Sequence, residues 1–383
     1  MKGKVSLLAL FPVLFSFYIV GFCDIVGISV SYIQSDFQLG NTMAGLFPAV
    51  VFIGFLFLPA PVIALASKIG CRKVALYGMG LTVLGMFIPF GMYSLLGCFI
   101  AFTLLGVGNI ALQVALNPLL FCVVSGNTLS VALTSTQLIK GVSAFCGPFV
   151  AAFAMSFWGN WYYVFPVFAV IALMAALCLS FTSVKGAGGC AYAASAESFA
   201  LLKDNHVLLL FLAAVCAAGI DVGMNVCIPK LMMVHCGHTV QDATLSSSVY
   251  FAFRTLGVFT GTMLLISFSE LKNFRIHVLI MLVAALGLLF AEGEYCILTL
   301  AGMVGFGCSS IFAIICSIAL RVCPDKANNV SVIMMAGMCG GAFVPLLMGV
   351  VADCTESQTA GLLILIVCML YLLYCSFKAA GRK

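Results

Sequence analysis

Long apolar runs separated by short polar breaks dominate the hydrophobic pattern of the chain. Runs of about 20 residues, bounded by charges, glycine, proline or asparagine, are long enough to cross a bilayer as helices. We expect twelve spans, which cover residues 7–32, 43–66, 74–92, 95–123, 129–157, 162–183, 207–229, 244–268, 275–291, 296–320, 329–352 and 360–377. The pattern therefore predicts an all-α integral membrane protein.

Composition agrees with this prediction and narrows the class of function. Hydrophobic residues make up 64% of the 383 positions and charged residues 8%, whereas a soluble domain has roughly 45–50% and 25%. Most of the 18 cysteines lie inside apolar runs, where we interpret them as small packing residues. No nucleotide-binding loop, nucleophile elbow or metal motif occurs, so we expect no enzyme activity, no cofactor, no metal and no nucleic-acid partner.

The basic residues in the loops predict an orientation. With twelve spans, fourteen lysines and arginines fall on the side of the two termini and only Lys230 on the other side. Basic loops stay on the cytoplasmic side, so we expect both termini in the cytoplasm and the protein in the inner (plasma) membrane. The basic start of the chain resembles a signal peptide, but its apolar run is too long and lacks a cleavage site, so it should remain as the first span.

The chain also divides into two similar halves. The longest polar interval, 184–206, separates six spans from six, which predicts bundles at 1–183 and 207–383 joined by a cytoplasmic linker. GFCDIVG in span one matches GIDVG in span seven, and GVG in span four matches GFG in span ten. Matches in the same order, in halves that enter from the same side, indicate parallel repeats.

Four ionisable residues lie inside the spans: Asp24, Lys140, Asp221 and Arg254. Counted at about 1.5 Å per residue, they share one layer, at depths of roughly 26, 17, 21 and 21 Å from the terminal side. Charges inside a membrane are costly and usually functional, and these four sum to zero. We therefore predict Asp24 and Asp221 as proton-coupling residues.

Structural alternatives remain open for each charge. Asp24 is either a proton acceptor modulated by Lys140 or half of a permanent ion pair with it. Lys140 either binds an anionic substrate or gates Asp24, because it lies too deep to reach an interface. Arg254 either grips a carboxylate or phosphate of the substrate or pairs with Asp221.

Uncharged amides complete the predicted substrate site. Gln113, Asn117, Gln137 and Asn225 can both donate and accept hydrogen bonds, which suits sugar hydroxyls, although such residues also join helices in membranes. Gln113 and Asn117 are four residues apart and share a helix face. With Lys140 and Arg254, these amides are our candidates for substrate binding.

Several stretches resemble the major facilitator superfamily, and within it the fucose permease and glucose/galactose transporter group. They are GVGNIALQVALNP in span four, STQLIKG and SAFCGP in span five, FTGTMLL in span eight and GGAFVPLLMGVVAD in span eleven. The resemblance implies twelve helices in two six-helix bundles with parallel pseudo-symmetry. The loop ALASKIGCRK resembles the superfamily's signature after span two, but Ser67 stands where that signature has an aspartate.

The same resemblance assigns roles to individual positions. Asp24 falls where the fucose permease family has a proton-carrying aspartate, Gln113 where it has a titratable glutamate, and Lys140 where it has an asparagine. The last two differences change the charge of the presumed site, so the family's two-acid relay and its fucose substrate do not transfer directly.

Together these observations predict a secondary active transporter that takes up a sugar or sugar-like solute with protons by alternating access. The first alternative is a transporter, for uptake or efflux, of a small organic anion gripped by Lys140 and Arg254, and the second is a non-transporting membrane sensor. The expected partners are the solute, protons and the lipid bilayer, and we expect a functional monomer.

Overall fold

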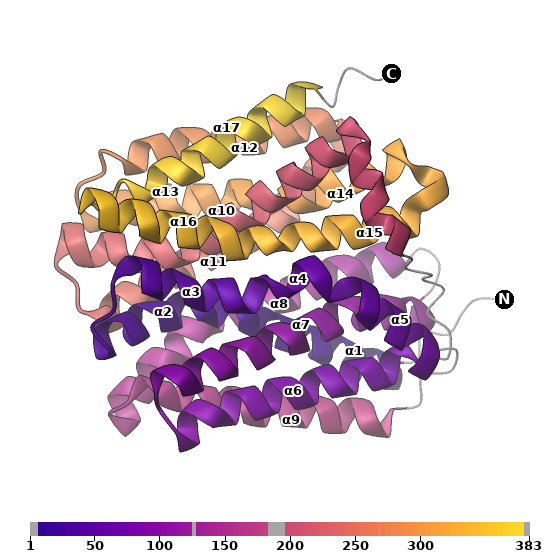
Figure 1. Cartoon of the computed structure of the whole chain (residues 1–383), viewed down its shortest axis with the longest axis horizontal. Coiled ribbons are helices and arrows are strands. Elements are labelled where there is room, and N and C mark those ends of the chain that lie inside the picture. Colours follow the sequence, from indigo (N-terminus) through magenta and orange to yellow (C-terminus); the bar gives the residue numbers. More distant parts are fainter. Residues whose placement is uncertain (1–6, 125–127, 183–195, 268, 379–383) are drawn as a thin grey trace.

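The computed structural model describes residues 7–124, 128–182, 196–267 and 269–378, and these contain helices and no strand (Figure 1). The first half holds α1 (Leu7–Val20), η1 (Gly21–Asp24), α2 (Ile25–Asp36), α3 (Asn41–Phe52), α4 (Gly54–Phe57), α5 (Pro59–Ile69), α6 (Cys71–Gly91), α7 (Leu95–Val123), α8 (Thr128–Trp158), η2 (Trp161–Tyr163) and α9 (Val164–Phe181). The predicted all-α fold is confirmed for this half.

The second half repeats the arrangement. It holds η3 (Ala196–Lys203), α10 (Asn205–Cys236), α11 (Val240–Ser267), α12 (Glu270–Leu288), α13 (Glu294–Cys308), α14 (Ile311–Val322), η4 (Pro324–Lys326), α15 (Ala327–Ala336), η5 (Gly337–Cys339), α16 (Gly340–Thr355) and α17 (Gly361–Lys378). Of the predicted linker 184–206, residues 184–195 lie outside the described residues. The two halves lie side by side, the second above the first in Figure 1.

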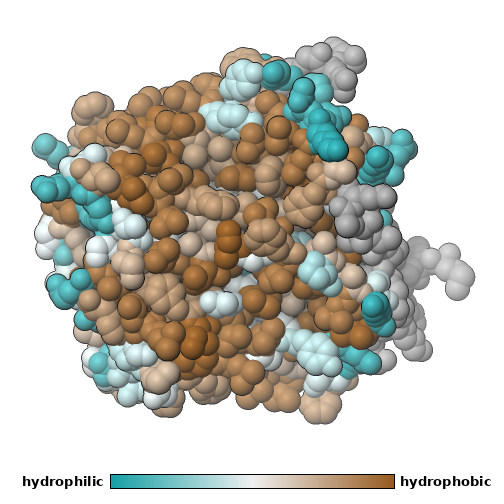
Figure 2. Space-filling model, viewed as in Figure 1, coloured by the Kyte–Doolittle hydropathy of each residue, from teal (hydrophilic) through white to brown (hydrophobic). Residues whose placement is uncertain are grey.

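Apolar surface covers the middle of the molecule, as expected for a membrane protein. Ten of the described helices are long and apolar enough to span a bilayer, or eleven if the bent pair Asn41–Phe57 and Pro59–Ile69 counts as one span. The remaining predicted span corresponds to α11, which has 28 residues. Figure 2 shows a hydrophobic band between more hydrophilic left and right ends.

We call the end where α1 begins and α17 finishes the terminal end. The opposite, distal end carries the turns from α2 to α3, from α10 to α11 and from α16 to α17. It lies at the left of Figure 1. Between the halves, α3 packs along α16 and α8 along α11, so two helix pairs form most of the interface.

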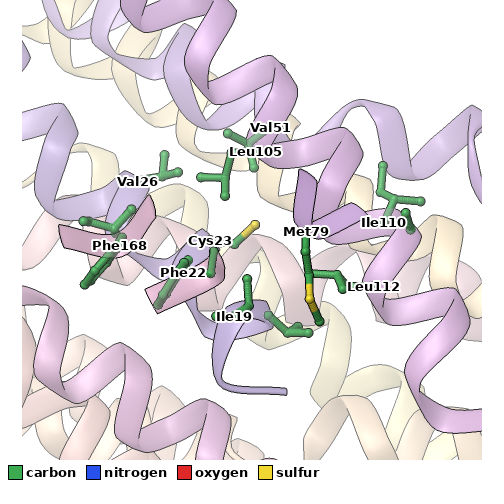
Figure 3. Packing of buried hydrophobic residues seen from close by; sticks show 14 of the residues in the cluster. Ile19, Phe22, Cys23, Val26, Val51, Met79, Leu105, Ile110, Leu112 and Phe168 are labelled. Atoms are coloured by element: carbon green, nitrogen blue, oxygen red, sulfur yellow. The ribbon is translucent and has the colours of Figure 1, made fainter. Parts of the chain in front are cut away.

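Each half has its own apolar core. Nearly all members of one cluster come from residues 13–179 and those of the other from residues 207–375, with a few side chains exchanged at the interface. In the first cluster the rings of Phe22 and Phe168 stack with centroids 4.2 Å apart, next to the break in the first span (Figure 3). This packing fixes η1 against α9. The domain boundaries at 183 and 207 remain a prediction.

The structure corrects details of the spans. The second span bends by 60° at Pro59 instead of running straight. Lys230, expected in a distal loop, is buried within α10, because that helix continues to Cys236. Among the residues that the structure describes, sixteen cysteines are free, whereas Cys71 is disulfide-bonded.

Candidate functional site

The first span is interrupted at the residue that the sequence marks as most unusual. A short 3-10 segment, η1, ends at Asp24, and α2 begins with the next residue. Gly21 permits close approach of α8, since a Cβ there would lie 2.6 Å from Ser143 Cβ and 2.7 Å from the Lys140 carbonyl oxygen. The backbone of α8 therefore packs directly against the break.

Two asparagines hold the carbonyl groups that flank this break. Asn109 Nδ2 donates to the Val20 carbonyl at 2.8 Å, and Asn225 Nδ2 donates to the Asp24 carbonyl at 2.6 Å. A carbonyl freed from a helix needs another donor inside a membrane. Asn225 comes from the second half, so the position of Asp24 is fixed from both sides of the interface.

The Asp24 carboxylate faces a guanidinium from the other half. Arg254 Nη1 lies 3.5 Å from Asp24 Oδ2, while Arg254 Nη2 lies 2.7 Å from Asp221 Oδ2. Tyr250 donates from its hydroxyl to the second oxygen of Asp221 at 2.8 Å. Two of the predicted residues, Asp221 and Arg254, thus form an ion pair within one half, and Asp24 approaches it across the interface.

The central ion cluster, Asp24, Asp221 and Arg254, is partly exposed. The side chains of the three residues are 20%, 20% and 27% exposed. When both carboxylates are ionised, two carboxylates and one guanidinium carry a net charge of −1, so one carboxylate lacks a full counter-ion within the cluster. The 3.5 Å contact of Asp24 is the longer and weaker of the two.

Lys140 does not pair with Asp24, contrary to one sequence interpretation. Within the described part of the chain its ammonium has neither an ion pair within 4 Å nor a hydrogen bond, although its backbone lies against Gly21. The cation that replaces it beside Asp24 is Arg254. The sequence placed both cations at similar depth, but it contained no information on which helix faces Asp24.

The four predicted amides take different places. Gln113 donates to Asn109 Oδ1 at 2.8 Å and so supports the break indirectly. Asn225 is 3% exposed, and its Oδ1 has no hydrogen-bond partner. Asn117 and Gln137 are exposed, and the structure does not bring them into the ion cluster.

Sequence reasoning missed Tyr250 and Asn109 at this site. Tyr250 precedes Arg254 by four residues, so both lie on one face of α11, and this spacing was a usable signal. Asn109 precedes Gln113 by the same interval on α7.

A second polar cluster, which the sequence did not reveal, joins the two halves at the distal end. The Asp353 carboxylate accepts hydrogen bonds from the backbone N–H groups of Asn41 and Thr42, at 3.0 and 2.8 Å. It also accepts from Asn41 Nδ2 at 2.9 Å and Thr42 Oγ1 at 2.6 Å. A carboxylate from α16 therefore caps the first turn of α3, where free N–H groups favour an anion.

Asn41 collects further contacts in the same cluster. Its Oδ1 accepts hydrogen bonds from Gln34 Nε2, Lys230 Nζ and Gln358 Nε2, at 3.0, 3.0 and 2.9 Å. The distal cluster, as we name Gln34, Asn41, Thr42, Lys230, Asp353 and Gln358, draws on α2, α3, α10, α16 and the turn before α17. It closes the interface at this end by direct polar contacts.

Comparisons with known proteins are consistent with this architecture. The family model described as Major Facilitator Superfamily matches residues 7–293. A solved structure of the fucose:proton symporter FucP, in the outward conformation, is similar at 18% identity, a TM-score of 0.70 and coverage of 99% of both chains; a related FucP structure is from E. coli.

Two other transporters have somewhat higher TM-scores and lower sequence identities. The nucleoside transporter NupG is similar at 12% identity and a TM-score of 0.75 over 100% of both chains. A bacterial homologue of the human lysosomal transporter Spinster, in an inward-facing unoccupied conformation, is similar at 15% identity and a TM-score of 0.77, with 99% and 98% of the two chains covered. No curated protein matches. At these identities the likeness shows the fold alone.

Proposed function

Because the chain belongs to the Major Facilitator Superfamily, a family of membrane transporters, we propose that it moves a sugar or sugar-like solute together with protons by alternating access. The observation that carries this proposal is the position of Arg254 between Asp24 of one half and Asp221 of the other. FucP, which shares the fold, is a fucose:proton symporter. The transporter class also agrees with the expectation that the protein is not an enzyme.

The geometry assigns different tasks to the two carboxylates. Asp221 is held by Arg254 at 2.7 Å and by the Tyr250 hydroxyl, so it remains with the second half when the halves move. Among the described residues, the Asp24 side chain has a single polar contact, the 3.5 Å approach to Arg254. Asp24 is therefore the carboxylate that exchanges its partner, and the one that we propose to carry the proton.

Protonation of Asp24 would change the force between the halves. With Asp24 charged, the guanidinium attracts both halves to each other across the interface. With Asp24 neutral, the remaining pair of Arg254 and Asp221 lies wholly in the second half, and the contact across the interface weakens to a hydrogen bond at most. A membrane field worth about 2.3 kcal/mol per charge per 100 mV would drive such proton movement.

We propose that the solute occupies the region between the ion cluster and the exposed amides. Asn117 and Gln137 are exposed and offer donors and acceptors to hydroxyl groups. Gln113 and Asn225 are more buried, and we propose that they position the break in the first span instead of contacting the solute. Arg254 contributes to solute binding only when Asp24 releases it.

A small organic anion is the second candidate solute, and one observation favours it. Lys140 has no acidic partner within 4 Å among the described residues, so its charge is available to a ligand. Arg254, by contrast, already contacts two carboxylates. Replacement of Lys140 by asparagine should abolish anion uptake and leave the uptake of a neutral sugar largely intact.

We further propose the expected orientation, with both termini in the cytoplasm and the protein as a functional monomer in the inner membrane. The basic residues near the terminal end support this orientation. Two six-helix bundles, 1–183 and 207–383, would then rock about the interface formed by α3 with α16 and α8 with α11.

Uptake into proteoliposomes with an imposed pH gradient tests the proposal. Neutral and acidic sugars are offered in parallel, and the expected result is accumulation above equilibrium that disappears when the gradient is collapsed. Asp24→Asn should abolish this accumulation while solute exchange at equal pH continues. Glu292→Gln, which removes an exposed acid from the loop before α13, serves as the control. Unchanged uphill uptake by Asp24→Asn would remove Asp24 from the proton path.

A further inference from the structure

A hollow of about 540 Å³ opens at the distal end, apart from the central ion cluster. One wall is the polar face of α2 and the turn that follows it, and the other wall is α10. The polar lining consists of Ser31, Gln34, Ser35, Gln38, Lys230 and Gln358. No acidic side chain lines it within the described residues, so the lining carries one positive charge.

The positive charge in this lining is unusually buried. Lys230 is only 8% exposed, and its ammonium donates to Asn41 Oδ1 at 3.0 Å. No carboxylate lies within 4 Å of it in the part of the chain that the structure describes. A buried ammonium can donate three hydrogen bonds and is costly without a counter-ion, so two donors and one charge remain to be matched.

A second polar group in the lining also has no partner. Ser31 is 2% exposed, and its hydroxyl oxygen forms no hydrogen bond with any residue that the structure describes. The side-chain amides of Gln34 and Gln358 flank the hollow and direct one donor each to Asn41 Oδ1, which leaves their carbonyl oxygens available. The hollow therefore offers one cation, one unpaired hydroxyl and several amide acceptors.

We propose that the distal hollow binds a small hydroxylated organic anion. Its carboxylate would pair with Lys230, and its hydroxyl groups would meet Ser31 and the amide oxygens of Gln34 and Gln358. This site goes beyond the proposed transport function, since it lies outside the central cluster and involves none of its charges.

The occupied hollow also connects to the closure of the distal end. The Lys230 ammonium contacts Asn41, and the backbone of Asn41 is capped by Asp353 from the other half. An anion held by Lys230 would therefore bind to the conformation in which α2 and α10 line the hollow and Lys230 contacts Asn41 of α3. Binding should therefore stabilise the folded protein with its distal end closed.

Thermal unfolding of the purified full chain, with gluconate or sorbitol as the probe, tests the site. The two compounds differ by a carboxylate in place of a hydroxymethyl group. We expect gluconate to raise the Tm by a few degrees and sorbitol to leave it unchanged. Lys230→Met and Ser31→Ala should lose most of the shift, and Lys230→Arg should keep part of it if Lys230→Met does not fold.

Lys140→Met distinguishes the two candidate anion sites, because it removes the lysine that lies near the central ion cluster and leaves the distal hollow intact. It should retain the gluconate shift. A shift lost in Lys140→Met but kept in Lys230→Met would overturn the proposal, and so would the absence of any gluconate shift in the unmodified protein. Because these measurements need no pH gradient and can be repeated in Asp24→Asn, they succeed or fail independently of proton-coupled transport.

Discussion

The central ion cluster and the distal cluster both join the two halves, but they do so with different kinds of contact. At the centre, the ion pair that crosses the interface is a 3.5 Å approach between Arg254 and Asp24, next to one hydrogen bond from Asn225 to the Asp24 carbonyl. At the distal end, the Asp353 carboxylate alone accepts four hydrogen bonds across the interface, at 2.6 to 3.0 Å. Charged side chains therefore dominate the contacts of the central cluster, whereas hydrogen bonds dominate those of the distal cluster.

This difference suggests that the distal contacts hold the two halves together, whereas the central contact can exchange its partner. A carboxylate whose oxygens accept several short hydrogen bonds is costly to displace, so we expect Asp353 to keep the distal end closed. A carboxylate with one long contact can be exchanged for a proton or a solute at small cost. An aspartate therefore has a different role at each place. Asp353 is a clasp, which holds the two halves together at the distal end, and Asp24 is a switch, which exchanges its partner at the centre.

The largest expected effect comes from removing the cation at the centre. Arg254→Met leaves two carboxylates facing each other without a counter-ion, and breaking a fully buried pair in this way costs about 3–5 kcal/mol. The cost here should lie below that range, because the guanidinium is 27% exposed. We expect a clear fall in Tm and complete loss of uptake, measured by thermal unfolding and in proteoliposomes.

Arg254→Lys separates charge from shape at the same position. The ammonium keeps the charge but lacks the planar fork that reaches Asp24 and Asp221 with different nitrogens. It should recover much of the stability and little of the transport. Full uptake by Arg254→Met would contradict the switch at the centre.

Opening of the distal clasp should have the next largest effect. Asp353→Ala removes four acceptor contacts across the interface, and a hydrogen bond to a charged group contributes about 1.5–3 kcal/mol when buried. The net loss should be near the lower value, since the hydrogen bonds of the Asp353 carboxylate are exposed. Cys227, which is 4% exposed and lines a small cavity with Asn41 and Lys230, should become accessible to N-ethylmaleimide.

The labelling of Cys227 is followed by peptide mass spectrometry, and Asp242→Asn is the matched control. Like Asp353, Asp242 accepts a hydrogen bond near the start of a helix, from Thr239 Oγ1 at 2.7 Å. Unlike those of Asp353, this contact stays within one half. The control should leave Cys227 protected. Equal labelling in Asp353→Ala and Asp242→Asn would show that the distal cluster does not keep this end closed.

Ten or eleven of the twelve predicted spans, and the presence of charges inside them, were predictable from sequence, because both depend on local composition. An apolar run of 20 residues is visible without tertiary information, and a charge inside it is conspicuous, as Asp24 and Arg254 were. The fold class is confirmed. The roles assigned to the individual site residues remain predictions.

The pairing of residues was not predictable, because it depends on the rotation of each helix about its axis. Lys140 and Arg254 lie at similar depth, and only the packing of α8 against Gly21 and the direction of α11 place Arg254, not Lys140, beside Asp24. Asp353 and Asn41 are 312 positions apart, and their contact follows only from the antiparallel ends of α3 and α16. The break at η1 was also missed, since residues 17–23 form an apolar stretch that gives no sign of a change in helix type.

The two carboxylates of the central cluster should differ in a smaller but informative way. Asp221→Asn loses a 2.7 Å ion pair, whereas Asp24→Asn loses a 3.5 Å contact, so the first should destabilise the protein by about 1 kcal/mol more. Coupling should follow the opposite order, with Asp24→Asn losing proton-driven accumulation more completely. Thermal unfolding and uptake on the same preparations measure both rankings, and agreement of the two rankings would refute the division of tasks.

The smallest effect concerns the hydroxyl that fixes Asp221. Tyr250→Phe removes the 2.8 Å hydrogen bond and keeps the buried ring, so the expected loss is about 0.5–1.5 kcal/mol. Asp221 then depends on Arg254 alone, and the guanidinium is held more tightly to its own half. Uptake should persist but need a steeper pH gradient, because Arg254 is less available to Asp24.

Thr255→Val, one residue beyond Arg254, is the control. It removes a hydroxyl whose hydrogen bond, among the described residues, goes to the Phe251 carbonyl. If both variants respond alike to the gradient, the hydroxyl of Tyr250 has no part in fixing Asp221, and the contrast between a fixed and an exchanging carboxylate rests on Arg254 alone.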